Sequence, residues 1–133
     1  MSYPEPQFCN IAIVDDDDAV RVALSSLLRS YGYTADAYDS AYALLAAGGL
    51  AQYHCVITDL QMPGMSGIEL LEQLRREGNR LPLILMTAFP EASLRKRALN
   101  GGASCFLSQP FEANDLLRCL RQAAGTDLPS PQE

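Results

Sequence analysis

The sequence predicts one α/β domain in which a parallel β-sheet carries helices on both faces. Short apolar runs alternate with amphipathic helical patterns, and this strand–helix unit occurs five times along 133 residues. Polar residues follow several of the apolar runs directly. Strict alternation of this kind is typical of doubly wound parallel sheets, for which a usual order of five strands is 2-1-3-4-5.

The first two units occupy the N-terminal part of the chain. The apolar run 9–14 is the first predicted strand, and the helix after it has apolar residues at i, i+4, i+7 and i+8 and ends at Gly32. A second strand is expected over 33–38. The short helix 41–47 follows it, with Ser40 or the preceding aspartate as its N-cap.

The other three units have the same design. The remaining predicted strands are short buried-type runs, which lie at 55–58, 83–86 and 104–107. Ser66 with Glu69 has the form of a capping box, so a helix should begin there and run to Gly78. The last two helices are expected over 91–100 and 112–124.

Composition limits the classes of function. A chain of 133 residues with 48% hydrophobic content supports one core, so we expect a domain over 9–124, an extension over 1–8 and a linker or tail over 125–133. The net charge of −6 argues against direct nucleic-acid binding by this domain. Without a span-length apolar run or a signal pattern, we expect a cytoplasmic protein that does not contact a membrane.

The four cysteines have neither metal-site spacing nor a C-x-x-C pair. We therefore expect reduced cysteines, with Cys55 and Cys105 in or beside apolar runs acting as small buried hydrophobes. The chain contains a single histidine, His54, which leaves little material for a histidine-based metal site or catalytic triad.

Polar residues that follow the predicted strands are the candidates for chemistry. Asp15 and Asp16 follow the first strand, Asp59 the third, Thr87 the fourth and Gln109 the fifth. Because ligands bind at the carboxyl ends of parallel strands, three carboxylates should converge at one edge of the sheet. Such like charges repel unless a cation neutralises them, and hard oxygen ligands suit Mg²⁺.

Helix capping is the alternative reading of the aspartates. Asp17 and Asp18 stand at the entrance of the first helix, and for them capping is the favoured interpretation. Capping also competes for Asp15 and Asp16 taken alone. It is weaker for Asp59, because the next N-cap candidate is Ser66.

Four segments together resemble the receiver domains of two-component response regulators. They are VDDDD at 14–18, TDLQMPGMSGIELL at 58–71, MTA at 86–88 and FLSQPF at 106–111. The resemblance covers about residues 9–124 and implies a flavodoxin-like (βα)5 fold. In style the chain is similar to receivers with a helix-turn-helix output domain of the nodulation and nitrogen-fixation type, which would lie beyond Glu133.

The resemblance implies roles for the strand-end residues. Asp59 would accept a phosphoryl group from a histidine kinase or phosphotransfer protein. Asp16, Asp59 and the backbone carbonyl of Gln61 would ligate Mg²⁺, and Asp15 would act through a water molecule. Apart from this self-phosphorylation and self-dephosphorylation, the resemblance implies no enzyme activity.

The resemblance also implies a switch. Thr87 would hydrogen-bond a phosphoryl oxygen, and Phe106 would turn inward and reshape the face formed by the fourth helix, fifth strand and fifth helix, through which homodimers form. The basic run 95–97 would contact acidic residues of a dimer mate. A kinase would dock on the exposed face of the first helix, around Arg21 and Ser25.

One position departs from the family pattern. Gln109-Pro110 stands where the family has Lys-Pro, and the single lysine of the chain, Lys96, lies in the fourth predicted helix. Glutamine donates a hydrogen bond but brings no charge. Two readings follow: a working receiver with weakened coupling to Thr87 and Phe106, or a pseudo-receiver that binds partners without phosphorylation. An aspartyl-phosphate hydrolase acting on free substrates is a third, little-supported reading. In the family the bond before this proline is cis, but the sequence does not determine the isomer at Pro110.

Overall fold

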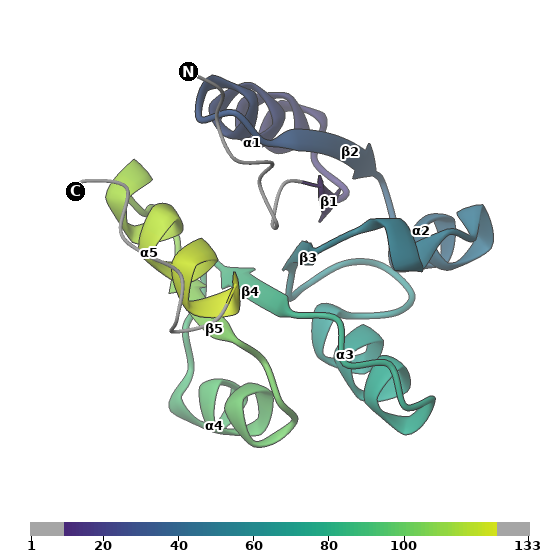
Figure 1. Cartoon of the computed structure of the whole chain (residues 1–133). Helices are drawn as coiled ribbons and strands as arrows, with labels where there is room; N and C mark the ends of the chain where they lie inside the picture. Colours follow the sequence, from purple (N-terminus) through teal and green to yellow (C-terminus); the bar gives the residue numbers. More distant parts are fainter. Residues whose placement is uncertain (1–9, 125–133) are drawn as a thin grey trace.

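The computed structural model of the chain describes residues 10–124, which form one five-stranded parallel sheet in the order β2-β1-β3-β4-β5 (Figure 1). The fold class and the strand order predicted from the sequence are therefore confirmed. The predicted extension 1–8, the tail 125–133 and the first residue of the first predicted strand lie outside the described residues.

The strands are β1 Asn10–Val14, β2 Thr34–Tyr38, β3 Cys55–Asp59, β4 Leu83–Thr87 and β5 Cys105–Ser108. The helices are α1 Asp18–Ser30, α2 Ala41–Ala47, α3 Gly67–Arg76, α4 Ala92–Asn100 and α5 Ala113–Ala124. A short 3₁₀ helix, η1 Leu50–Gln52, was not predicted. Among the described residues, no helix is long and apolar enough to cross a membrane.

The sheet separates two clusters of buried apolar side chains, one on each face. α1 and α5 lie on one face of the sheet, and α2, α3 and α4 lie on the other (Figure 1). In β1, Ile11 and Ile13 face the first cluster while Ala12 and Val14 face the second. Because helices cover both faces, the central strands are continuous apolar runs. Because the strands are parallel, their carboxyl ends lie at the same edge of the sheet.

Capping residues fix where two helices begin next to that edge. Asp17 Oδ1 accepts the N–H of Val20 at 3.1 Å and caps α1, which confirms the capping reading for Asp17. Ser66 and Glu69 form the predicted capping box at the start of α3. The caps therefore fix where the loop after β1 ends and α1 begins, and where the loop after β3 ends and α3 begins.

The cysteine prediction is wrong for one pair. Cys105 and Cys119 form a disulfide between β5 and α5, while Cys55 is free and buried as expected. The two bridged residues are separated by 14 positions, and packing of α5 on the sheet brings their Cα atoms to 5.6 Å. This proximity is tertiary, so cysteine spacing in the sequence does not reveal it.

Candidate functional site

Three carboxylates meet at the carboxyl edge of the sheet. Val14 of β1 pairs with Thr58 of β3, so the next residues, Asp15 and Asp59, lie side by side at the ends of neighbouring strands. One carboxylate oxygen from each of Asp15, Asp16 and Asp59 lies within 4.8 Å of the other two. The structure thus brings together the three aspartates that the sequence predicted would converge.

Burial and mutual repulsion make this cluster costly to ionise. Burial raises the pKa of Asp59 to about 6, and the charges of Asp15 and Asp16 add to the rise, while backbone N–H groups of the following loop lower it in part. Burial also raises the pKa of Asp15, although the N–H of Asp17 donates to its Oδ1 at 2.9 Å. A cation that neutralises these charges would be bound favourably.

The donor set fits a hard divalent cation. Asp15 is buried, Asp59 is half-buried and Asp16 is exposed, so the cluster opens to solvent on the Asp16 side. Carboxylate oxygens on a loop that keeps access to water are the ligands that Mg²⁺ prefers. The backbone of Gln61, two residues beyond Asp59, lies in the loop that follows β3, and its predicted role as a ligand remains a prediction.

Gly67 is a positioning residue that the sequence reasoning missed. Its N–H donates to Leu60 O at 2.9 Å, and a Cβ at this position would lie 2.4 Å from Asp59 O and 2.7 Å from Leu85 Cδ2. The first turn of α3 therefore packs against the Asp59 backbone with no room for a side chain at position 67. A glycine in the first turn of a well-capped helix is the available sequence signal, because glycine is otherwise unfavourable there.

Thr87 and Gln109 lie next to each other at the ends of β4 and β5. Thr87 is fully buried, and its Oγ1 accepts the N–H of Phe89 at 3.0 Å. The N–H of Gln109 donates to Thr87 O at 2.7 Å, and the peptide bond to Pro110, whose isomer the sequence left open, is cis. The glutamine thus occupies the strand-end position that the family resemblance assigned to a lysine.

Phe106 is already buried in this structure, with 8% of its surface exposed. It belongs to the apolar cluster that α3 and α4 cover, and the guanidinium carbon of Arg95 lies 5.8 Å from the centre of its ring. The aromatic side chain therefore lies inward in this structure, and its role as a switch remains a prediction. Arg95, from the basic run, covers it within the same chain.

One surface expectation needs correction. Ser25 is buried, at 9% exposure, so it does not belong to the exposed face of α1 on which a kinase was expected to dock. Arg97 of the basic run pairs with Glu72 of α3 through two contacts of 2.9 and 3.0 Å, and its side chain stays exposed to solvent. The contact of the basic run with a dimer mate remains a prediction.

An apolar cleft of about 510 Å³ lies beside the acidic cluster. It runs between α1 and the segment after β5, and the residues that line it are Val20, Ala23, Leu24, Leu27, Ala88, Gln109, Pro110 and Phe111. Arg21, on the same helix, donates to Asp15 O at 2.6 Å and pairs with Asp18. The cleft therefore begins on the same turns of α1 that contact Asp15 and Asp17.

Curated proteins with similar sequences are regulators. The chain is 38% identical over 120 residues to the transcriptional regulatory protein FixJ of Azorhizobium caulinodans, covering 90% of this chain and 57% of the relative. It is 39% identical over 113 residues to the response regulator protein TmoT of Ectopseudomonas mendocina, covering 85% of this chain and 51% of the relative. The chain spans about half the length of these relatives.

Solved structures agree with the sequence comparison. The crystal structure of FixJ-N superimposes with a TM-score of 0.81 at 31% identity and covers 94% of this chain and 99% of that one. Residues 11–121 match the family described as response regulator receiver domain. Because this match covers most of the chain, including every strand end described above, the chain belongs to the response regulator receiver domain family.

Proposed function

We propose that Asp59 is the phosphoacceptor of this receiver domain and that a histidine kinase or phosphotransfer protein is its donor. The observation that carries the proposal is the position of Asp59, at the end of the central strand β3 within a cluster of three carboxylates. Residues 9–124 would act as the receiver unit, 1–8 as an extension and 125–133 as a linker or tail.

The reaction needs an ionised carboxylate that is exposed enough to reach a donor. Asp59 is half-buried, and its pKa of about 6 leaves it mainly ionised at neutral pH. A carboxylate oxygen of Asp59 attacks the phosphorus of a phosphohistidine, so an O–P bond forms and the P–N bond breaks. The electron pair of the broken bond stays on the imidazole nitrogen, and an acyl phosphate remains on Asp59.

The same cluster would hold Mg²⁺ through carboxylate oxygens of Asp16 and Asp59 and the carbonyl of Gln61. When bound, Mg²⁺ supplies positive charge that offsets the carboxylates and the incoming phosphoryl group. Asp15 keeps its place through the N–H of Asp17 and through Arg21, which holds the Asp15 backbone. The buried Thr87 hydroxyl would donate to a phosphoryl oxygen after modification.

Partner binding would use two faces. The apolar cleft beside α1 suits the docking of a kinase or phosphotransfer protein, because it lies along the helix that follows Asp15 and Asp16 and is lined mainly by aliphatic side chains. The α4–β5–α5 face, which contains Phe106, would form homodimers. The matched segments make up only 57% and 51% of these two relatives, and one of them is a transcriptional regulatory protein, which supports a DNA-binding output domain beyond Glu133.

Phosphorylation by a small phosphodonor tests the proposal. The protein is incubated with acetyl phosphate and Mg²⁺, and intact mass is measured against samples with EDTA. We expect wild type to gain one phosphoryl group only with Mg²⁺, and Asp59→Asn to gain none. Asp17→Asn serves as the matched control. Asp17 caps α1, and asparagine is also a good N-cap residue, so this substitution should leave the modification of Asp59 intact.

Absence of modification in folded wild type, with both a small donor and a kinase, would refute the phosphoacceptor role. The phosphorylation-independent interaction module would then replace it, and Asp59→Asn should leave partner binding unchanged. Turnover of small phosphate esters would instead indicate a hydrolase.

A further inference from the structure

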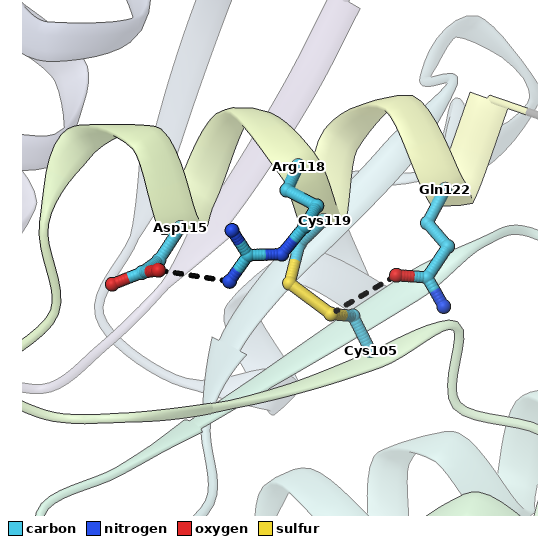
Figure 2. The surroundings of a disulfide bond; sticks show 5 residues. All are labelled: Cys105, Asp115, Arg118, Cys119 and Gln122. Carbon is cyan, nitrogen blue, oxygen red and sulfur yellow. Dashed lines mark hydrogen bonds and ion pairs between the residues drawn. A yellow bond between two sulfur atoms is a disulfide. The ribbon is translucent and has the colours of Figure 1, made fainter.

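A covalent bond joins the edge strand of the sheet to the helix that covers it. β5 is the outermost strand and pairs only with β4 in the described sheet. The disulfide between Cys105 of β5 and Cys119 of α5 adds a second attachment to this edge (Figure 2). Disulfide formation therefore limits how far α5 can move relative to β5.

The bond lies in the face proposed to change on phosphorylation. Cys105 is the residue before Phe106, and Cys119 lies in the middle of α5. Figure 2 shows the Asp115–Arg118 ion pair and Gln122 on the same helix alongside the bond. A movement of β5 at Phe106 is thus coupled to a movement of α5 through the Cys105–Cys119 bond.

The chemistry of the three described cysteines differs by position. Cys105 is partly exposed, while Cys119 is buried with Leu116 and Leu120 in the cluster beneath α1 and α5. Cys55 is fully buried in β3, and burial raises the pKa of its thiol well above the usual value. An external thiol or disulfide can therefore reach Cys105, whereas Cys55 is inert.

We propose that Cys105 and Cys119 form a reversible thiol–disulfide modification site that fixes α5 to β5 when oxidised and releases it when reduced. Its effect on partner binding rests on the proposed function, because the α4–β5–α5 face is the dimer face of that proposal. The oxidised face is pre-organised, so its dimers lose less conformational freedom on association.

A low-molecular-weight disulfide is the oxidant this step requires. The Cys105 thiolate attacks one sulfur of the small disulfide, and a mixed disulfide forms as the first small thiolate leaves. The Cys119 thiolate then attacks Cys105 Sγ and releases the second. Two protein thiols lose two protons and two electrons, and the small disulfide becomes two thiols. A dithiol reductant reverses the reaction.

The test uses the full chain with Cys9→Ser, which leaves Cys55, Cys105 and Cys119. Reduced and glutathione-disulfide-treated samples are denatured, alkylated and weighed, and peptides are mapped. We expect three alkylated cysteines in the reduced sample, and only Cys55 alkylated in the oxidised one. Equal alkylation in both samples would overturn the proposal.

Amide hydrogen exchange tests the coupling and does not require phosphorylation. We expect amides of α5 to exchange about tenfold more slowly in the oxidised form, because the bond removes states in which the helix opens. Cys55→Ser should retain this difference, and Cys105→Ser should abolish it. A bond that forms without changing exchange in α5 would overturn the coupling.

Dimerisation after phosphorylation gives the functional readout. We expect the oxidised, phosphorylated protein to dimerise about tenfold more tightly than the reduced one, with no redox dependence in Cys105→Ser. Equal or weaker dimerisation of the oxidised form would overturn the effect on partners. If Asp59 accepts no phosphoryl group in either form, the proposed function fails, while alkylation and exchange still decide the modification site.

Discussion

Asp59 combines two properties that oppose each other in the folded chain. Its position at the end of β3 next to Asp15 and Asp16 suits the proposed site for a cation and a phosphoryl group, but it also places a half-buried charge beside two others. The raised pKa of Asp59 is the measurable sign of this conflict. The carboxylate that the proposed function needs at this position therefore lowers the stability of the metal-free protein.

Asp59→Asn should stabilise the metal-free protein at neutral pH. The folded pKa of Asp59, about 6, exceeds the ordinary value of 3.8. The contribution of this one carboxyl to the free energy of unfolding is therefore most favourable below pH 3.8 and is lost as pH rises through about 6. Allowing for solvent screening of a half-exposed group, we expect a gain of about 1 kcal/mol at pH 7.5. Urea unfolding in EDTA measures it, and the gain should vanish near pH 4. A variant no more stable than wild type at pH 7.5 would contradict the prediction.

Gln109→Lys should lower the pKa of Asp59. Gln109 adjoins Thr87 through a 2.7 Å backbone hydrogen bond, and a lysine there would bring a cation to the carboxylate edge. We expect the pKa of Asp59 to fall by about one unit or more, as for carboxylates that gain a nearby cation. Titration of carboxyl NMR signals measures it, with Gln109→Met as the uncharged control. Equal values in the two variants would show that position 109 does not reach Asp59.

At the scale of elements, α3 determines how the Asp59 loop is held. The capping box fixes the first turn of α3, and Gly67 lets that turn contact the Asp59 backbone. The sequence predicted the capping box because both partners are three residues apart. It did not reveal the contact, because Gly67 meets a backbone oxygen from another element.

Gly67→Ala should destabilise the domain more than Gly101→Ala. The new Cβ would lie 2.4 Å from Asp59 O at position 67 but 3.2 Å from the nearest atom at position 101. We expect Gly67→Ala to cost about 1–3 kcal/mol through displacement of α3, as overpacking does elsewhere. Urea unfolding of the two variants and wild type decides, and equal losses would contradict a tight contact at Gly67.

For the whole molecule, Mg²⁺ should increase thermal stability through the carboxylate cluster. A ligand that binds only the folded state stabilises it by about 1–3 kcal/mol when its concentration is ten to a hundred times its Kd. We expect Tm to rise in MgCl₂ relative to NaCl of matched ionic strength. Asp16→Asn should remove the rise, and Asp17→Asn should retain it. A rise that survives in Asp16→Asn would place the ion elsewhere.

The sequence alone determined the alternation of strands and helices, the capping of α1 and α3, and the convergence of Asp15, Asp16 and Asp59. These features depend on periodicity, on residues three apart and on a parallel topology that brings strand ends together. Packing decided the rest: the Cys105–Cys119 bond, the burial of Ser25 and Phe106, the pairing of Arg97 with Glu72, and the raised pKa of Asp59. Each of these depends on distances between residues from different elements, which only the tertiary structure sets.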